Sequence, residues 1–226
     1  MKVLVAEDDA NTRAGLVEIL EMEGYEVIAA SNGADALALF HGETPDFVCL
    51  DVMMPQMNGY DVCREIRKHN SRVPVIFISA KSEEVDKVIG LELGADDFIM
   101  KPFGVKEVVA RIRAITRRCF ANSANEDSRF AIADLTVSPD ELRARRGDSV
   151  IDLSLRDVKI LQLFADNAGK ALTRTMIYNH AWGPGSVANS RCLDQHIAQL
   201  RKRIEQDPRH PAIIRTVHGM GYRWDG

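Results

Sequence analysis

Polar side chains suited to phosphoryl or metal chemistry stand at the ends of apolar runs in the first half of the chain. They are Glu7, Asp8, Asp9, Asp51, Ser79 and Lys101. Crowded carboxylates repel one another unless a cation lies among them, and Mg²⁺ prefers carboxylate, water and phosphate oxygens. An aspartate can also attack phosphorus and form an aspartyl-phosphate. Because Asp51 stands alone at its strand end, the pattern predicts a Mg²⁺ site with Asp51 as phosphoacceptor; the alternative is that Asp51 caps a loop and the acidic run is solvated.

These side chains are spread over about 100 residues, so the fold must bring them together. Short apolar runs predict five buried strands at 2–6, 25–30, 46–50, 73–79 and 97–100. Amphipathic segments between them predict helices, at about 33–41, 58–69 and 83–94 among others, and a last one carries an apolar stripe from Val105 to Ile115. Strands alternating with helices predict a doubly wound, parallel five-stranded sheet of the flavodoxin-like type. In such sheets chemistry collects at the carboxyl ends of the strands.

The second half of the chain follows a different pattern. We predict a first domain at 1–118, a polar linker at 119–128 and a second domain at 129–226. Strands are expected at 130–137, 142–147 and 149–153, and then helices after the capping residues Ser154 and Thr173 and from about Ala188 to Glu205. Two β-type runs around a Gly-containing turn close the chain as a hairpin. Helices followed by a hairpin predict an α+β winged helix-turn-helix.

The third of these helices has one apolar and one polar face. Leu193, Ile197, Leu200 and Ile204 form the apolar stripe. The other face presents Asn189, Arg191, Gln195, His196, Gln199, Arg201, Lys202 and Arg203. Cations bind phosphates, and Asn, Gln and Arg read base edges in the major groove, so this face, together with His218 in the hairpin turn, is predicted to bind DNA. An ordinary solvated helix is the alternative.

Charge and composition agree with this division. Residues 1–120 carry 14 basic and 20 acidic residues, whereas 168–223 carry nine basic and three acidic ones. This asymmetry predicts that only the second half meets a polyanion. No apolar run is long enough to cross a bilayer and the N-terminus is no secretory signal, so a cytoplasmic location is expected. The four cysteines show no zinc-ligand spacing and are expected to be reduced thiols.

Four blocks of the first half resemble the signature blocks of response-regulator receivers. They are VAEDD at 5–9, LDVMMPQMNGYD at 50–61, ISAK at 78–81 and KPF at 101–103. The resemblance implies Mg²⁺ ligands at Asp8, Asp51 and the Met53 carbonyl, with Glu7 acting through water. It further implies that Ser79 and Lys101 bind the phosphoryl group and that the Lys101-Pro102 bond is cis. Ser79 and Phe98 would form the conformational switch, with Phe98 where the family often has Tyr.

The second half resembles the effector domain of the OmpR/PhoB family over about 129–225. The matching segments are LSLRDVKILQLFADNAGKALTR, the Trp182-Gly183 pair, LDQHIAQLRKRIE and RTVHGMGYRW. The resemblance implies a two-component transcriptional regulator whose partners are a sensor histidine kinase, promoter DNA and RNA polymerase. Some relatives carry Arg at the position of Gln199, and related proteins often use Arg at that of His218, so no base preference is implied.

The resemblance also implies a homodimer that forms on phosphorylation. Its charge pairs across the two-fold axis would be Lys87 with Glu107, Asp97 with Arg111 and Asp96 with Arg118. Pairing within one chain is the alternative.

Two other function classes are weighed against this one. An α/β phosphotransferase or phosphatase commonly has a second acid two residues after the nucleophile, but Met53 occupies that position and no substrate-covering cap is encoded. The chain is therefore expected not to be a turnover enzyme, although its aspartyl-phosphate could hydrolyse itself. A receiver that has lost phosphorylation would be expected to lack some of Glu7, Asp8, Asp51, Ser79 and Lys101, and all five are present.

Overall fold

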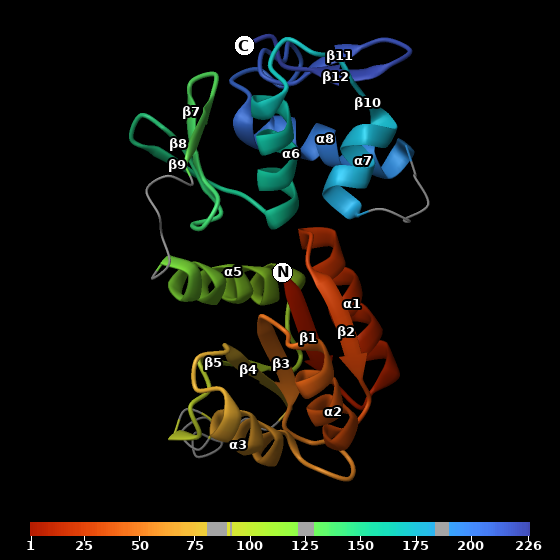
Figure 1. Ribbon diagram of the computed structural model, residues 1–226, viewed down its shortest axis with the longest axis vertical. Helices are drawn as coiled ribbons and strands as arrows, with labels where there is room; N and C mark the ends of the chain where they lie inside the picture. The colour runs from red at the N-terminus through yellow and green to blue at the C-terminus, as the bar shows by residue number, and fades with distance from the viewer. Residues whose placement is uncertain (81–89, 91, 122–128, 184–189) are drawn as a thin grey trace. The chain divides into compact units, whose positions relative to one another are not determined.

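The computed structural model describes residues 1–80, 90, 92–121, 129–183 and 190–226, and within these ranges the side chains at 118–121 and 190 are not described. The chain divides into two compact units, Met1–Cys119 and Phe120–Gly226 (Figure 1). Each unit is described by itself. Within the described ranges, none of the helices combines the length and the apolar character that a bilayer crossing needs.

The first unit is the predicted doubly wound sheet. Its strands are β1 (Lys2–Ala6), β2 (Glu26–Ala30), β3 (Phe47–Asp51), β4 (Val75–Ser79) and β5 (Asp97–Met100). They are all parallel, in the order β2-β1-β3-β4-β5. The order reverses between β1 and β3, so the carboxyl ends of these two strands border the crevice in which such sheets bind ligands.

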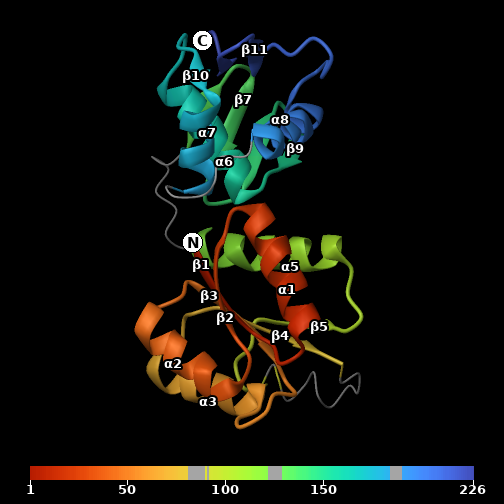
Figure 2. The same cartoon turned by 90° about the vertical axis from the view of Figure 1, so that its right-hand side faces the viewer.

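Helices cover both faces of this sheet. They are α1 (Ala10–Glu23), α2 (Gly33–Glu43), α3 (Gly59–His69) and α5 (Val105–Ala121). Figures 1 and 2 show α2 and α3 together on one face, with α1 and α5 on the other. This double cover explains why β3 and β4 are buried along their whole length and why their sequences read as continuous apolar runs.

One boundary in this unit differs from the sequence prediction, and one predicted helix is not tested. The helix α5 extends through Ala121, three residues into the predicted linker, because neither Gly nor Pro interrupts it there. The helix predicted at 83–94 lies mostly outside the described residues.

The second unit begins with an antiparallel sheet of four strands in sequence order. They are β6 (Phe130–Ile132), β7 (Leu135–Ser138), β8 (Arg143–Arg146) and β9 (Ser149–Asp152). The single strand predicted at 130–137 is wrong, because the chain turns at Ala133 and forms the hairpin β6–β7. Ala133 adopts a left-handed φ of 53°, and its apolar side chain hid the turn from a reading of the pattern.

The rest of this unit is the predicted winged helix-turn-helix. The helices are α6 (Leu155–Asp166), α7 (Arg174–Trp182) and α8 (Ser190–Ile204). The strands β11 (Arg215–Val217) and β12 (Gly221–Arg223) form the hairpin, and a two-residue strand, β10 (Leu172–Thr173), pairs with β12. Since 184–189 are not described, the predicted helix start at Ala188 is untested.

Candidate functional site

Three carboxylates meet at the carboxyl ends of β1 and β3. The ligand oxygens of Glu7, Asp8 and Asp51 all lie within 4.8 Å of one another. Glu7 and Asp51 are buried, whereas Asp8 is exposed at the edge of the group. The third acid of the run, Asp9, has a structural role instead, because its carboxylate accepts the main-chain N–H of Thr12 at 2.8 Å and caps α1.

Lys101 reaches this cluster from the loop after β5. Its Nζ lies 2.7 Å from Asp51 Oδ2 and 2.8 Å from Glu7 Oε1. The Lys101-Pro102 peptide bond is cis, as predicted. Residues separated by 94 positions in the sequence are therefore in direct contact.

Among the described residues of this pocket, negative charge exceeds positive charge. Burial raises the pKa of Glu7 to about 7, against the opposing hydrogen bond from Lys101 and with a further upward contribution from Asp51. Although Glu7 Oε2 lies 2.7 Å from Lys101 Nζ, no described residue donates a well-directed hydrogen bond to it. A buried carboxylate oxygen without a donor, next to two further carboxylates, fits a hard divalent cation such as Mg²⁺.

The backbone around these acids is held by two residues that the sequence reading missed. Arg13 Nη1 donates to the carbonyls of Glu7 and Asp8 at 2.6 and 3.1 Å, fixing the turn that presents both acids. A Cβ at Gly59 would lie 2.1 Å from the Asp51 carbonyl, so only glycine lets α3 begin there. Asp51 Oδ1 accepts the N–H of Met53 at 3.1 Å, and the Met53 side chain points to solvent.

Ser79 and Phe98 lie on neighbouring strands behind the cluster. Ser79 is fully buried at the end of β4, and its carbonyl accepts the N–H of Lys101 at 2.8 Å. Phe98 is buried in β5, with its ring centroid 6.3 Å from that of Phe77. Their roles as a switch stay predictions.

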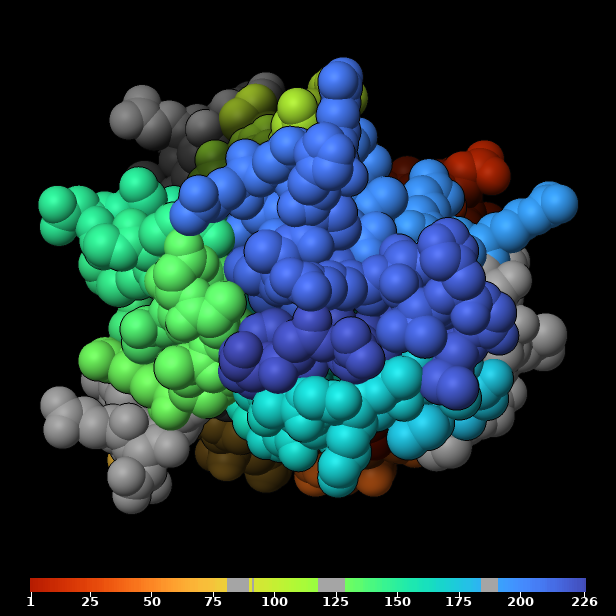
Figure 3. Space-filling view, turned by 90° about the horizontal axis from the view of Figure 1, so that it is seen from above, coloured from red at the N-terminus to blue at the C-terminus, as the bar shows by residue number. Residues whose placement is uncertain are grey.

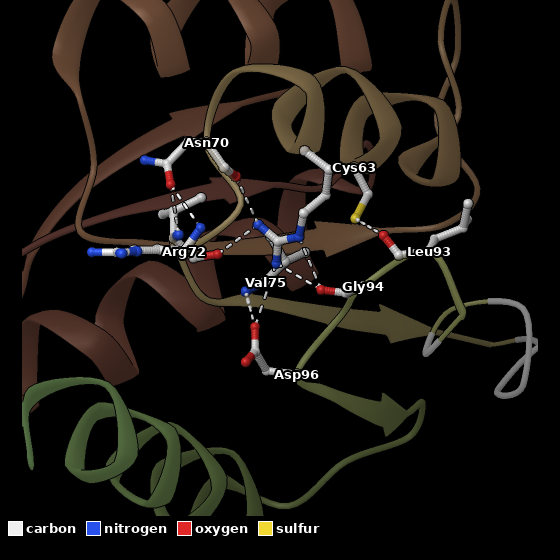
Figure 4. Close-up of polar contacts among 9 residues, drawn as sticks. Cys63, Asn70, Arg72, Val75, Leu93, Gly94 and Asp96 are labelled. Carbon is white, nitrogen blue, oxygen red and sulfur yellow. Dashed lines mark hydrogen bonds and ion pairs between the residues drawn. The ribbon is translucent and has the colours of Figure 1, made fainter. Parts of the chain in front are cut away.

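Of the residues predicted to pair across a dimer, the described ones have partners within their own chain. Arg111 contacts Asp97 at 3.0 Å and Glu107 at 3.0 Å. Asp96 accepts the N–H of Val75 at 2.9 Å and lies 3.5 Å from Arg67 (Figure 4). Lys87 and the side chain of Arg118 lie outside the described part of the chain.

Arg67 is a further positioning residue, since it fixes the turn into β5. Its guanidinium donates to the carbonyls of Gly94 and Val73, both at 2.7 Å, and of Asn70 at 3.2 Å. Figure 4 shows that Asn70, Gly94 and Asp96 lie close together in this region. The start of β5 is thereby tied to the end of α3.

In the second unit, α8 buries the predicted apolar stripe completely. Arg191, Gln195, Gln199 and Lys202 are exposed along one side. Asn189 lies outside the described residues, and His218 is exposed in the turn between β11 and β12.

Three residues placed on the polar face of α8 instead serve contacts within the domain. His196 Nε2 lies 3.0 Å from Asp157 Oδ1, and Arg203 Nη1 lies 2.7 Å from Asp157 Oδ2. Arg201 donates to the carbonyl of Ile214 at 2.9 Å and to Thr216 Oγ1 at 2.9 Å. Helical spacing alone did not reveal these partners.

Asp157 is the centre of this second cluster. It is fully buried, and it forms a capping box with Ser154 at the start of α6. Burial opposes its ionisation, but the hydrogen bond from His196 and the charge of Arg203 outweigh burial and hold the pKa of Asp157 below its usual value. Asp157 therefore joins α6 to α8.

Aromatic contacts complete this joint. The Trp182 ring stacks on Tyr178, with ring centroids 4.7 Å apart, and meets His196 edge-on at 5.4 Å. The guanidinium of Arg156 lies 4.2 Å from the centre of the Trp182 ring. The end of α7 is thus packed against the same two helices.

Comparison with known proteins agrees with both halves of this description. The family model "Response regulator receiver domain" matches residues 3–113, and "Transcriptional regulatory protein, C terminal" matches residues 147–224. The sensory transduction protein RegX3 of Mycobacterium tuberculosis is 39% identical, over 99% of this chain and 99% of that protein.

A further relative supports both halves of this assignment, and a solved structure supports the receiver half. The alkaline phosphatase synthesis transcriptional regulatory protein PhoP of Bacillus subtilis is 37% identical, over 98% of this chain and 95% of that protein. A CheY-like receiver domain protein of Methanospirillum hungatei has a TM-score of 0.52 and 26% identity, over 54% of this chain and 97% of that one. With a receiver and an effector that match along the whole chain, the protein belongs to the OmpR/PhoB family of two-component response regulators and is a transcriptional regulator.

Proposed function

We propose that the receiver accepts a phosphoryl group on Asp51 from a sensor histidine kinase, and that this event controls promoter binding by the effector. The observation that supports the proposal is the contact of Lys101 with Asp51 at 2.7 Å, beside a Glu7 oxygen that receives no well-directed hydrogen bond from a described residue. A nucleophilic carboxylate and a cation thus lie within a group of carboxylates whose negative charge is not fully neutralised.

Each pocket residue has a definite role in this reaction. An Asp51 oxygen attacks phosphorus while the bond to the donor's imidazole nitrogen breaks, and the imidazole retains the electron pair of that bond. The N–H of Met53 holds Asp51 Oδ1, and Lys101 neutralises charge on the phosphoryl oxygens. Glu7, Asp8, Asp51 and the Met53 carbonyl would hold Mg²⁺, which when bound neutralises the same oxygens.

Incubation of the full chain with Mg²⁺ and acetyl phosphate tests this directly. We expect intact-mass spectrometry to show one added phosphoryl group in the parent chain and none in Asp51→Asn. Asp46→Asn, which changes an exposed aspartate of the same domain, is the matched control and should label normally. Equal labelling of Asp51→Asn would refute the assignment.

A turnover phosphotransferase is a less suitable function for this pocket. Acid-base turnover at an aspartyl-phosphate needs a second acid near the nucleophile, and the residue two positions after Asp51 is Met53. We therefore propose that the phosphorylated protein is a signalling state rather than a catalytic intermediate.

The proposed output is a two-fold dimer that places two effector domains on promoter DNA in the cytoplasm. RNA polymerase at the same promoter is the further proposed partner. Arg111 would exchange Asp97 of its own chain for Asp97 of a second copy, and Ser79 with Phe98 would link this exchange to phosphorylation. Arg111→Glu should weaken dimerisation of the phosphorylated protein in sedimentation, and the added change Asp97→Arg should restore part of it. If the double variant shows no recovery, the two residues do not meet across an interface.

DNA contacts are proposed for the exposed residues of α8 and for the hairpin turn. Arg191, Gln195 and Gln199 have the donors and acceptors that read base edges, and Lys202 has the charge that binds phosphate. His218 would enter the adjacent groove. His196 and Arg203 are proposed to orient α8 through Asp157.

A further inference from the structure

The effector has a second cationic feature beside the exposed side of α8. A cavity of about 590 Å³ lies between the C-terminal half of α8, the segment after it and β11. Its lining residues are Arg201, Pro208, Arg209, His210, Pro211, Ala212, Arg215, Thr216 and His218. Three arginines and two histidines are among these described residues and no carboxylate is, so this α8–β11 pocket favours an anion.

The segment that forms one wall of the α8–β11 pocket is firmly held. The buried carboxylate of Glu205 accepts the main-chain N–H groups of Ala212, Ile213 and Ile214 at 2.8 to 3.0 Å. Charge-assisted hydrogen bonds of this kind are stronger than neutral ones. The chain therefore leaves α8 in a defined direction.

The turn before it is equally defined. Asp207 accepts the N–H of Arg209 at 2.9 Å and lies 2.8 Å from His210 Nδ1. Pro208 and Pro211 flank Arg209 and His210 and restrict the backbone φ on either side of these two residues. Arg209 and His210 are thus presented by a pre-organised turn.

The arginines of the pocket differ in the hydrogen bonds and ion pairs that their guanidinium groups already form within the domain. Arg201 is anchored to Ile214 and Thr216, and Arg215 lies 2.8 Å from Asp225. Among the described residues, no hydrogen bond or ion pair holds the guanidinium of Arg209. The free guanidinium is the group that an incoming anion would meet.

The position of the pocket indicates which anion this is. A helix in the major groove and a hairpin in the minor groove lie on opposite sides of one sugar-phosphate strand. The α8–β11 pocket opens between these two elements, which adjoin on the face drawn in Figure 3, where α8 is blue and the hairpin darker blue. We propose that the pocket binds a phosphodiester of the DNA backbone through Arg209, with His210 and Thr216 as further hydrogen-bond donors.

This inference rests on the proposed DNA binding and adds a contact outside the predicted reading face. The planar fork of an arginine matches two phosphate oxygens, and it stays charged at every physiological pH. Since the contact is to the backbone, it would strengthen binding to any sequence and fix the register of α8 in the groove.

The test is the salt dependence of binding to a fluorescent duplex of random sequence, measured by anisotropy with the full chain before and after incubation with Mg²⁺ and acetyl phosphate. For Arg209→Ala we expect about fivefold to tenfold weaker binding at low salt and a slope of log K against log salt that is less steep by about 0.9, the value for one phosphate contact. Arg145→Ala, which removes an exposed arginine of β8, should leave the slope unchanged.

The outcomes separate the two proposals. If the parent chain binds the duplex at low salt in neither state, DNA binding itself is wrong. If it binds and Arg209→Ala keeps the parent slope, only the pocket inference is wrong. Inorganic phosphate is the second probe: if it shifts the His210 ring resonances and the duplex does not, the ligand is a free anion and the phosphodiester assignment is overturned.

Discussion

The two domains each bury a carboxylate beside cations, and the two centres are balanced differently. In the receiver, Glu7 and Asp51 share the single ammonium of Lys101, with Asp8 at the edge. In the effector, Asp157 alone receives His196, Arg203 and the N–H of Ser154. The first centre has surplus negative charge and an oxygen without a donor among the described residues, whereas the second is fully satisfied.

This difference separates a binding site from a structural joint. A buried charge that is fully paired has no capacity left for a ligand, and losing one partner leaves the others uncompensated. A buried group of carboxylates short of positive charge instead gains from an incoming cation. The comparison therefore predicts that removing the carboxylate from the Asp157 centre strongly destabilises its domain, whereas removing the charge of Asp51 from the receiver pocket changes stability little.

The largest effect is expected at Asp157. The change Asp157→Ala should lower the free energy of unfolding of the effector by about 3–5 kcal/mol, because His196 and Arg203 lose their shared partner and α6 loses its capping box. Both tryptophans, Trp182 and Trp224, belong to this domain, so urea denaturation followed by tryptophan fluorescence reports on it.

Asp148→Ala is the control for that experiment, since it changes an exposed turn aspartate and should stay within about 0.5 kcal/mol of the parent. A loss below about 1 kcal/mol in Asp157→Ala would show that the buried pairing does not hold the domain together.

An intermediate effect is expected from the protonation of Glu7. Its pKa is raised to about 7 in the metal-free fold, so the metal-free receiver should lose stability as pH rises from the ordinary pKa of a glutamate towards 7. Mg²⁺ must displace this proton. Its dissociation constant should therefore fall about tenfold between roughly pH 5.5 and 6.5 and level off above 7.

Isothermal titration calorimetry in two buffers of different ionisation enthalpy measures the released proton. In Glu7→Gln the proton release should disappear and the affinity should change little with pH. A parent affinity that is flat over the same range would mean that Glu7 is already ionised without metal.

The smallest effect is expected at Asp51. Asp51→Asn removes one negative charge from a crowded pocket and one hydrogen bond from Lys101, so without Mg²⁺ the receiver should change by less than about 1 kcal/mol in either direction. Hydrogen exchange of the β3 amides in the full chain measures this. Destabilisation above about 2 kcal/mol would show that Asp51, like Asp157, is a structural charge, and the difference between the two centres would not hold.

The sequence predicts the receiver pocket well for a physical reason. Parallel strands that are covered on both faces read as unbroken apolar runs, and their carboxyl ends share one edge. The sequence therefore predicts Asp51 and Lys101 in one pocket, where they are in contact. The same reasoning puts Ser79 there, and its side-chain role stays a prediction. Arg13 and Gly59 were missed, because one donates to main-chain carbonyls and the other acts through the side chain it lacks.

The effector was harder to predict on the same grounds. The apolar stripe of α8 follows from helical period alone, but the partners of its polar side chains depend on what α6 presents to them. In the sequence, Asp157 is only an acid three residues after the capping residue Ser154, and the fold brings His196 and Arg203 to it. The pocket behind Arg209 needs three segments of the chain at once.

The contact between Arg111 and Asp97 within one chain has a consequence for partner choice. If dimerisation exchanges this pair for the same pair across the two-fold axis, one contact is lost for each that forms, and the net Coulombic gain is small. If this chain dimerised with a related regulator that has another residue at either position, its internal Arg111–Asp97 pair would be lost and no equivalent pair would form across the interface. The Arg111–Asp97 pair would then contribute more to specificity, by disfavouring heterodimers with related regulators, than to the affinity of the homodimer.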